Sequence, residues 1–75
     1  MNYAWTKGKR RYKGKRNSKH GLAHDLVIMK NIKLSKKDCE YLDIRNSSLA
    51  ELQRVRFFEW STLLEHKGWE WVKLS

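Results

Sequence analysis

The distribution of charge along the chain restricts its fold more than any other feature of the sequence. Residues 1–20 contain eight lysines and arginines and no acidic residue, whereas the remaining nine basic residues and all eight acidic residues lie further along the 75-residue chain. A segment with repelling charges and few aliphatic side chains cannot bury enough apolar surface to offset the entropy lost on ordering. We therefore expect residues 1–21 to be a disordered basic arm, and residues 22–75 to form one small domain.

The short folded part makes catalysis an unfavoured function. A domain of about 60 residues buries only about 60% of the surface that its unfolded chain exposes, so a deep cleft with a supporting shell is hard to build. The sequence also has no paired-carboxylate, Ser-His-Asp or phosphate-cradling glycine motif. We expect a protein that is not an enzyme and uses no cofactor.

The side chains best suited to zinc do not have the spacing of a zinc site. A structural site is built from closely spaced Cys or His pairs, and only one cysteine is present. Cys39 is expected to be a small buried side chain, and it cannot form an intramolecular disulfide. We expect no metal, and a reducing compartment: the cytoplasm, in association with the nucleoid or the ribosome, or the nucleus if the source is eukaryotic.

The longest apolar run, Leu26 to Met29, is far shorter than the roughly 20 residues that cross a bilayer. We therefore expect no membrane partner.

Periodicity and capping residues predict the elements of the folded part. Alternation over residues 26–34 predicts a strand, with a short helix over residues 22–30 as the alternative, because four adjacent apolar residues fit either. Ser35 and Asp38 form a capping box that predicts a helix over residues 36–44. Ser48 and Glu51 form a second box, which predicts a helix over residues 48–66 that ends at Gly68.

The last segment completes the predicted fold. Residues 69–74 alternate like a strand, with Trp69 and Trp71 on one face. The predicted fold class is α+β, in the order strand-helix-helix-strand, with the terminal strands paired and both helices on one face.

The two predicted helices also fit a truncated winged helix-turn-helix, which is the alternative fold. Residues 58–74, a helix closing with Leu63-Leu64 and Gly68 before an aromatic strand, resemble the recognition helix and wing of that class. A reading helix over residues 48–66 would present Arg45, Arg54 and Arg56 near its start. A simple packed helical hairpin explains the same segments without any function.

The basic arm carries the strongest functional signal. The chain has a formal net charge of +9 and an isoelectric point near 10.0, which favours nucleic acid as the partner. Lysines and arginines neutralise phosphates, and interleaved aromatic rings stack on unpaired bases. The candidate contacts in the arm are Tyr3, Trp5, Lys7, Lys9, Arg10, Arg11, Tyr12, Lys13, Lys15, Arg16 and Lys19.

These observations predict a small, non-enzymatic regulator of transcription, of cellular or viral origin, that binds DNA or RNA. One alternative is a ribosome-associated RNA-binding protein. Another is an inhibitor that docks on an acidic surface of a host machine such as RNA polymerase, anchored by Phe58 and an exposed tryptophan. We expect deletion of residues 1–19 to leave the fold intact and to remove most of the affinity for nucleic acid.

Overall fold

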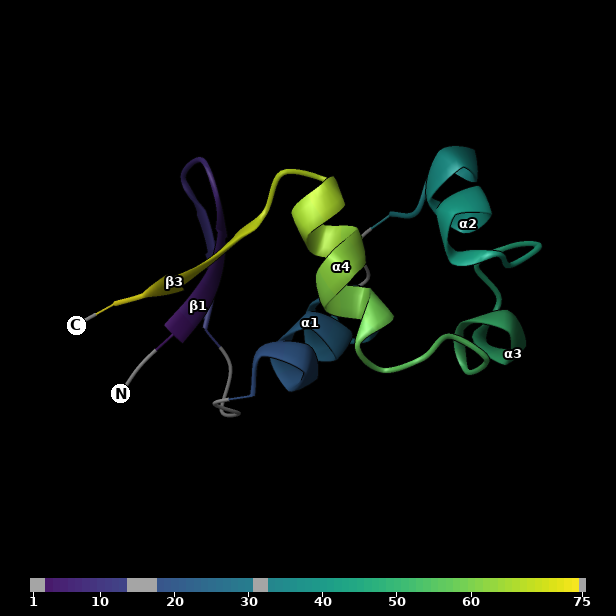
Figure 1. Ribbon diagram of the computed structural model, residues 1–75, viewed down its shortest axis with the longest axis horizontal. Helices are drawn as coiled ribbons and strands as arrows, with labels where there is room; N and C mark the ends of the chain where they lie inside the picture. The colour runs from purple at the N-terminus through teal and green to yellow at the C-terminus, as the bar shows by residue number, and fades with distance from the viewer. Residues whose placement is uncertain (1–2, 14–17, 31–32, 75) are drawn as a thin grey trace.

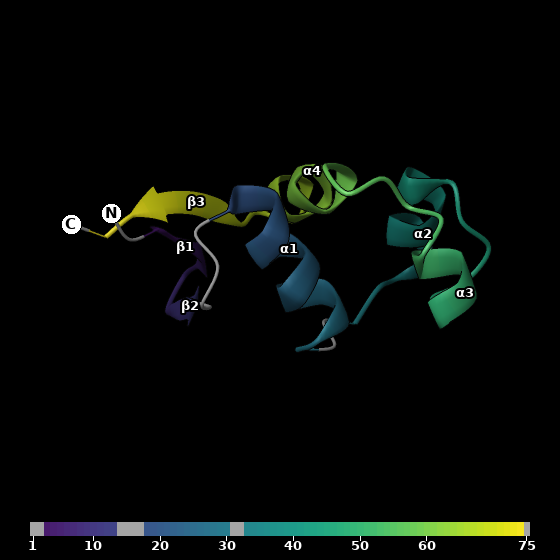
Figure 2. The ribbon, with the colours of Figure 1, turned by 90° about the horizontal axis from the view of Figure 1, so that it is seen from below.

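The computed structural model describes residues 3–13, 18–30 and 33–74 of the chain. Three strands lie at one end of the molecule, two helices lie in the middle, and two short helices lie at the other end (Figures 1 and 2). The elements are β1 (Tyr3–Lys7), β2 (Arg10–Tyr12), α1 (Lys19–Ile28), α2 (Lys36–Leu42), α3 (Leu49–Leu52), α4 (Glu59–His66) and β3 (Glu70–Lys73). The α+β class predicted from the sequence is confirmed, whereas the predicted order of elements is wrong.

The N-terminal basic segment forms two strands of the sheet. β1 pairs antiparallel with both β2 and β3, which gives the strand order β2-β1-β3. Gly8 and Lys9 form the turn between β1 and β2, and Gly8 has a φ of 61°, a conformation that glycine adopts without strain. The predicted disorder is therefore wrong for residues 3–12, while residues 14–17 lie outside the described part of the chain.

Composition alone misled the prediction because it does not show how the aromatic residues of this segment pair across the sheet. Trp5 lies opposite Tyr12 of β2 and Trp71 of β3, so three aromatic side chains share one face of the sheet. The Trp5 side chain is fully buried, with 0% of its surface exposed. Two short strands with few apolar residues are thus ordered by the rings that they bury.

Residues 19–28 form a helix, which includes the first three residues of the strand predicted over residues 26–34. The side chain of Ser18 caps α1 by accepting a hydrogen bond from the backbone N–H of Gly21 at 3.1 Å. Leu22 and Leu26, one turn apart, are buried together with their neighbours Ala23 and Val27, and α1 packs against α4 and β1. The predicted strand is wrong for residues 26–30, 33 and 34, whereas its residues 31–32 lie outside the described part of the chain; the alternative helix is correct up to Ile28.

α2 follows the capping box predicted from the sequence. The Ser35 hydroxyl accepts from the Asp38 N–H at 3.2 Å, and the Asp38 carboxylate accepts from the Ser35 N–H at 2.9 Å. The helix ends at Asp43, which has a φ of 58° in the left-handed region. The helix predicted over residues 36–44 is confirmed, apart from its last two residues.

The long helix predicted over residues 48–66 is two helices instead. Ser48 caps α3, but the Glu51 side chain accepts from the N–H of Arg45 at 2.9 Å instead of from Ser48. No residue of α3 is buried, so packing does not extend this helix beyond one turn. The continuous reading helix that the winged helix-turn-helix alternative requires is therefore not formed.

α4 and β3 complete the core. Trp60, Leu63 and Leu64 of α4 are buried among the residues of α1 and β1. Gly68 follows the helix with a φ of 95°, and the chain turns into β3. The strand predicted over residues 69–74 is confirmed for residues 70–73, but its partner is β1 and not residues 26–34.

Among the described residues, no helix combines the length and the apolar composition needed to cross a membrane.

Candidate nucleic-acid interface

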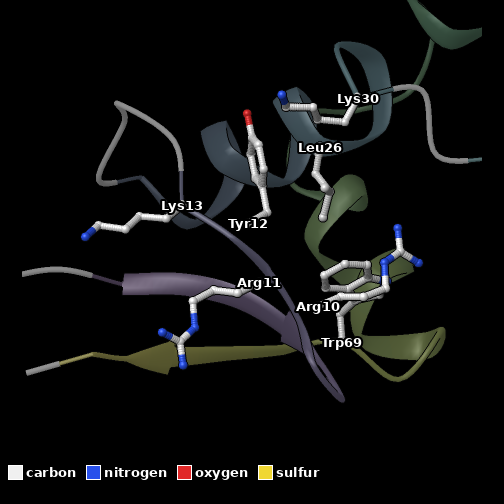
Figure 3. A pocket seen from close by; sticks show the side chains of 7 residues that line it. All are labelled: Arg10, Arg11, Tyr12, Lys13, Leu26, Lys30 and Trp69. Atoms are coloured by element: carbon white, nitrogen blue, oxygen red, sulfur yellow. The ribbon is translucent and has the colours of Figure 1, made fainter.

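An open groove of about 490 Å³ lies between β2 and the end of α1 (Figure 3). Four of its lining residues are cationic and none is acidic, so positive charge gathers along it. The groove is lined by Arg10, Arg11, Tyr12, Lys13, Leu26, Lys30 and Trp69. We call this feature the cationic groove, and Arg10, Arg11, Lys13 and Lys30 the groove cations.

The guanidinium of Arg10 lies over the ring of Trp69. Its central carbon is 5.0 Å from the ring centroid, within the range of a cation–π contact. The indole is buried, with 4% of the residue exposed, whereas Arg10 itself is exposed. The core therefore provides a fixed platform beneath one face of an exposed guanidinium (Figure 3).

A second cation and aromatic ring meet on the side of the groove formed by α1. The ammonium of Lys30 lies 5.9 Å from the ring centroid of Tyr12. Lys30 follows the last turn of α1, where the partial negative charge of a helix C-terminus favours a cation. Tyr12 is half-buried and packs against the core, which fixes the position of this side of the groove.

The side chains of Arg11 and Lys13 extend away from the wall of the groove that Leu26 and Trp69 form. In Figure 3 both side chains extend away from Leu26 and Trp69, as expected for Arg11, which alternates along β2 with Arg10 and Tyr12. Arg11 also lines a second open depression of about 500 Å³, together with Thr6, Gly8, Lys9, Arg10 and Val72. The β1–β2 hairpin therefore presents cations from both of its faces.

The groove cations are not the ones engaged in ion pairs within the described part of the chain. Those pairs join Lys19 to Glu65 at 3.3 Å, Arg54 to Glu51 at 3.1 Å, and Lys67 to Asp38 at 2.6 Å, and the ring of His24 lies 3.6 Å from the Asp25 carboxylate. The charge of the groove is thus available to an external anion, while the charges of Lys19 and Lys67 have internal partners.

The structure divides the candidate contacts of the N-terminal segment into three groups. Arg10, Arg11, Tyr12 and Lys13 meet at the cationic groove. Lys7 and Lys9 lie on the exposed end of the hairpin. Lys15 and Arg16 lie outside the described residues.

Two of the aromatic rings predicted to stack on bases, those of Trp5 and Tyr3, make contacts within the protein instead. Trp5 is buried, with the ammonium of Lys19 at 5.8 Å from its ring centroid. Tyr3 stacks on Trp71, with ring centroids 5.3 Å apart and an interplanar angle of 6°. The prediction that Trp5 stacks on nucleic acid is therefore wrong, and Tyr12 is the candidate ring that lines the groove.

The arginines expected on a reading helix lie at the far end of the molecule. Arg45 and Arg54 flank α3, and Arg56 lies between α3 and α4, whereas the groove is formed beside the sheet (Figure 1). None of these three arginines is among the residues that line the groove. The backbone N–H of Arg56 donates to the Glu59 carboxylate at 3.2 Å, which places Arg56 at the start of α4 and outside any apolar helix face.

Sequence analysis did not identify three lining residues, namely Leu26, Lys30 and Trp69. Lys30 follows α1, the end of which was predicted as part of a strand, so its position beside the sheet was not expected. Trp69 is 59 positions from Arg10, and only the pairing of β3 with β1 brings the two together. No local pattern in the sequence signals that contact.

The histidines and the cysteine have structural surroundings. The hydroxyl of Ser61, which is 2% exposed, lies 2.6 Å from Nδ1 of His20, a residue at the exposed start of α1. Cys39 is buried, as predicted. Within the described residues, no three His, Cys, Asp or Glu side chains form a group suited to a metal ion.

No protein-family model, curated protein or solved structure matches this chain. Its function is therefore inferred from the geometry and the charge of its own residues.

Proposed function

We propose that this chain is a non-enzymatic nucleic-acid-binding protein that holds a phosphate backbone along the β1–β2 hairpin and the cationic groove. The observation that carries the proposal is the gathering of four cations, and no carboxylate, around one groove. A nucleic acid carries a regular series of phosphates. Lysine and arginine side chains neutralise these phosphates and release their counterions, which favours binding. A partner with regularly spaced phosphates suits cations that extend on both sides of the groove.

The fold also fixes the positions of the cations that attract the phosphates. A disordered arm would present its cations without a fixed arrangement, whereas β2 holds Arg10 and Tyr12 in register against Lys7 and Trp5 of β1. Cations on a rigid element lose less side-chain freedom on binding. We propose that the hairpin sets where the nucleic acid lies, and that its exposed end, with Lys7 and Lys9, extends the contact.

The small size of the chain favours a regulatory or assembly role. A protein that only binds can act by blocking other proteins from the same stretch of nucleic acid. We therefore propose that this chain is a small regulator of transcription. A ribosome-associated RNA-binding protein uses the same surface and is the alternative.

Salt dependence tests the proposal. Binding of a fluorescently labelled single-stranded oligonucleotide is measured by fluorescence anisotropy at several salt concentrations. Contact of the four groove cations with phosphates gives a slope of about −3 in a plot of log affinity against log salt, at about −0.7 per contact. Absence of binding to both DNA and RNA at physiological salt contradicts the proposal.

A protein partner is a second candidate, favoured by one observation at the other end of the molecule. Leu49, Phe57 and Phe58 are 62%, 47% and 49% exposed, although large apolar side chains of this kind favour burial. The anchors expected from the sequence were Phe58 and an exposed tryptophan. Trp60, the tryptophan nearest to Phe58 in the sequence, is 1% exposed and buried in the core, so we propose Leu49, Phe57 and Phe58 as the anchors instead.

The charges near these apolar residues fit an acidic segment of a partner. The Glu51 carboxylate accepts hydrogen bonds from the N–H of Arg45 and from the guanidinium of Arg54, and these contacts lower the pKa of Glu51 below its ordinary value. The Glu59 carboxylate accepts from the N–H of Arg56. Both acids are thus turned toward the chain, while the arginines are exposed.

A further inference from the structure

We infer that the cationic groove takes one unpaired nucleotide, with its base stacked on the outer face of the Arg10 guanidinium. This inference rests on the proposed function and names its substrate class: single-stranded nucleic acid, recognised through a base as well as through phosphates.

The contact between Arg10 and Trp69 is the first observation. A guanidinium is planar, and both of its faces can stack on aromatic rings. The central carbon of Arg10 lies over the Trp69 ring, 5.0 Å from the ring centroid. Arg10 is exposed and lines the groove, so its guanidinium can also meet a base that enters the groove. A base placed there completes a three-layer stack of indole, guanidinium and base.

The size and the lining of the groove are the second observation. Its volume of about 490 Å³ lies in the range of sites for single small molecules, about 300–1,000 Å³. Leu26, Tyr12 and Trp69 supply apolar or aromatic surface around the cations. A base in a duplex is stacked on its neighbours and has no free face, so only an unpaired base can enter.

The placement of the remaining cations is the third observation. Lys30 lies on the side of α1, over the ring of Tyr12, while Lys13 and Arg11 extend from the side of β2 (Figure 3). A strand that enters the groove beside Lys30 and leaves beside Lys13 keeps a cation near the phosphate on each side of the stacked base. The groove thus resembles a clamp for one nucleotide within a longer strand.

Two oligomers that differ only in their bases test this inference. We would measure the binding of labelled oligodeoxythymidylate and of an abasic oligomer with the same number of phosphates, by fluorescence anisotropy, for the wild type, Arg10→Lys and Arg56→Lys. Lysine keeps the charge but has no planar group to stack. Arg56→Lys is the matched control, because Arg56 is an exposed arginine that does not line the cationic groove.

We expect the wild type to bind the oligomer with bases at least fivefold more tightly than the abasic one, the lower bound for stacking of one base. Arg10→Lys should lose most of this preference while keeping its affinity for the abasic oligomer, and Arg56→Lys should keep the preference. Equal wild-type affinity for both oligomers overturns the stacked base and leaves the phosphate contacts standing. An equal loss on both oligomers in Arg10→Lys overturns the role of Arg10 as a platform. Failure of the wild type to bind either oligomer instead contradicts the proposed function.

Discussion

The indole Nε1 of Trp5 donates a hydrogen bond to the backbone carbonyl oxygen of Lys19 at 3.1 Å and thereby joins β1 to the first turn of α1. The same ring belongs to the core that Leu22, Leu63 and Leu64 form between the helices. A residue from the most basic part of the chain is therefore a structural residue, and the cations beside it are held by the fold.

Trp5→Ala should destabilise the protein severely. Truncation of a buried tryptophan costs about 3–5 kcal/mol, a large part of the roughly 5–15 kcal/mol that stabilises a small domain. Urea unfolding followed by far-UV circular dichroism measures the change, with Lys9→Ala in the exposed turn as the control. For the same reason, deletion of residues 1–13 should unfold the chain, contrary to the expectation of a removable arm. A deletion variant with wild-type stability would contradict this account of the sheet.

Tyr3 and Tyr12 should respond differently to substitution by alanine. Tyr3 stacks on Trp71, and such a pair contributes about 0.5–1.5 kcal/mol, so Tyr3→Ala should lower the free energy of unfolding and leave nucleic-acid affinity unchanged. Tyr12 lines the cationic groove, so Tyr12→Ala should also weaken binding to a single strand. Thermal unfolding and anisotropy, carried out on both variants, separate the two effects. Equal loss of affinity in both variants would count against the assignment of the groove.

The ion pair of Asp38 and Lys67 should make stability depend on acidity below about pH 4. Burial raises the pKa of Asp38, but the hydrogen bonds from Lys67 and from the Ser35 N–H, with the charge of Lys67, outweigh it and lower the pKa below its ordinary value of 3.8. A carboxylate with a lowered pKa in the folded state stabilises it above the ordinary pKa, and this contribution is lost as the pH falls through the folded pKa.

Asp38→Asn is the variant that isolates this effect, because the amide oxygen still accepts from the Ser35 N–H. We expect it to lose about 1–3 kcal/mol at pH 7, since Lys67 is left without its carboxylate. The difference in unfolding free energy from the wild type should be constant from pH 7 to pH 5 and should shrink below pH 4. A difference that stays the same at pH 3, in urea unfolding series, would show that the charge of Asp38 contributes nothing.

The exposed apolar residues near α3 should be dispensable for folding and for nucleic-acid binding. Leu49→Ser combined with Phe58→Ser should change stability by about 1 kcal/mol or less, because both side chains are largely exposed. Affinity for a single strand should stay at the wild-type value, while binding to an acidic protein partner should be lost. A drop in nucleic-acid affinity in this variant would mean that the interface reaches the far end of the molecule.

Local signals in the sequence predicted the parts of the fold that depend on neighbouring residues. The box formed by Ser35 and Asp38 located α2, and the alternation after Gly68 located β3. The same approach failed for residues 3–12, because average composition hides the strand pairing that buries Trp5 in the core and leaves Arg11 exposed. It also failed after Ser48, because a capping box predicts where a helix begins and not how far packing extends it.

The candidate site was predicted in composition but not in geometry. Arg10, Arg11, Tyr12 and Lys13 were predicted as contacts, since charge and aromatic content are visible in the sequence, and all four line the groove. Their arrangement depends on Trp69 and Lys30, which reach the groove only through the pairing of β1 with β3 and the packing of α1. Contacts between residues so far apart do not produce a periodic pattern in the sequence, so they cannot be predicted from it.

Two variants with the same loss of charge test most directly whether the groove binds nucleic acid. One replaces the groove cations Arg10, Arg11, Lys13 and Lys30 by glutamine, and the other replaces four exposed cations elsewhere, Lys33, Lys36, Lys37 and Arg45. Each removes four positive charges, so the formal net charge falls from +9 to +5 in both.

Their affinities for a labelled single-stranded oligonucleotide are measured across a salt series, with circular dichroism to confirm folding. We expect the groove variant to lose most of the affinity and about 3 units of the salt slope, at about 0.7 per phosphate contact, while the control keeps both near the wild-type values. Equal losses in the two variants would show that binding follows total charge, and would contradict the assignment of the cationic groove as the nucleic-acid site.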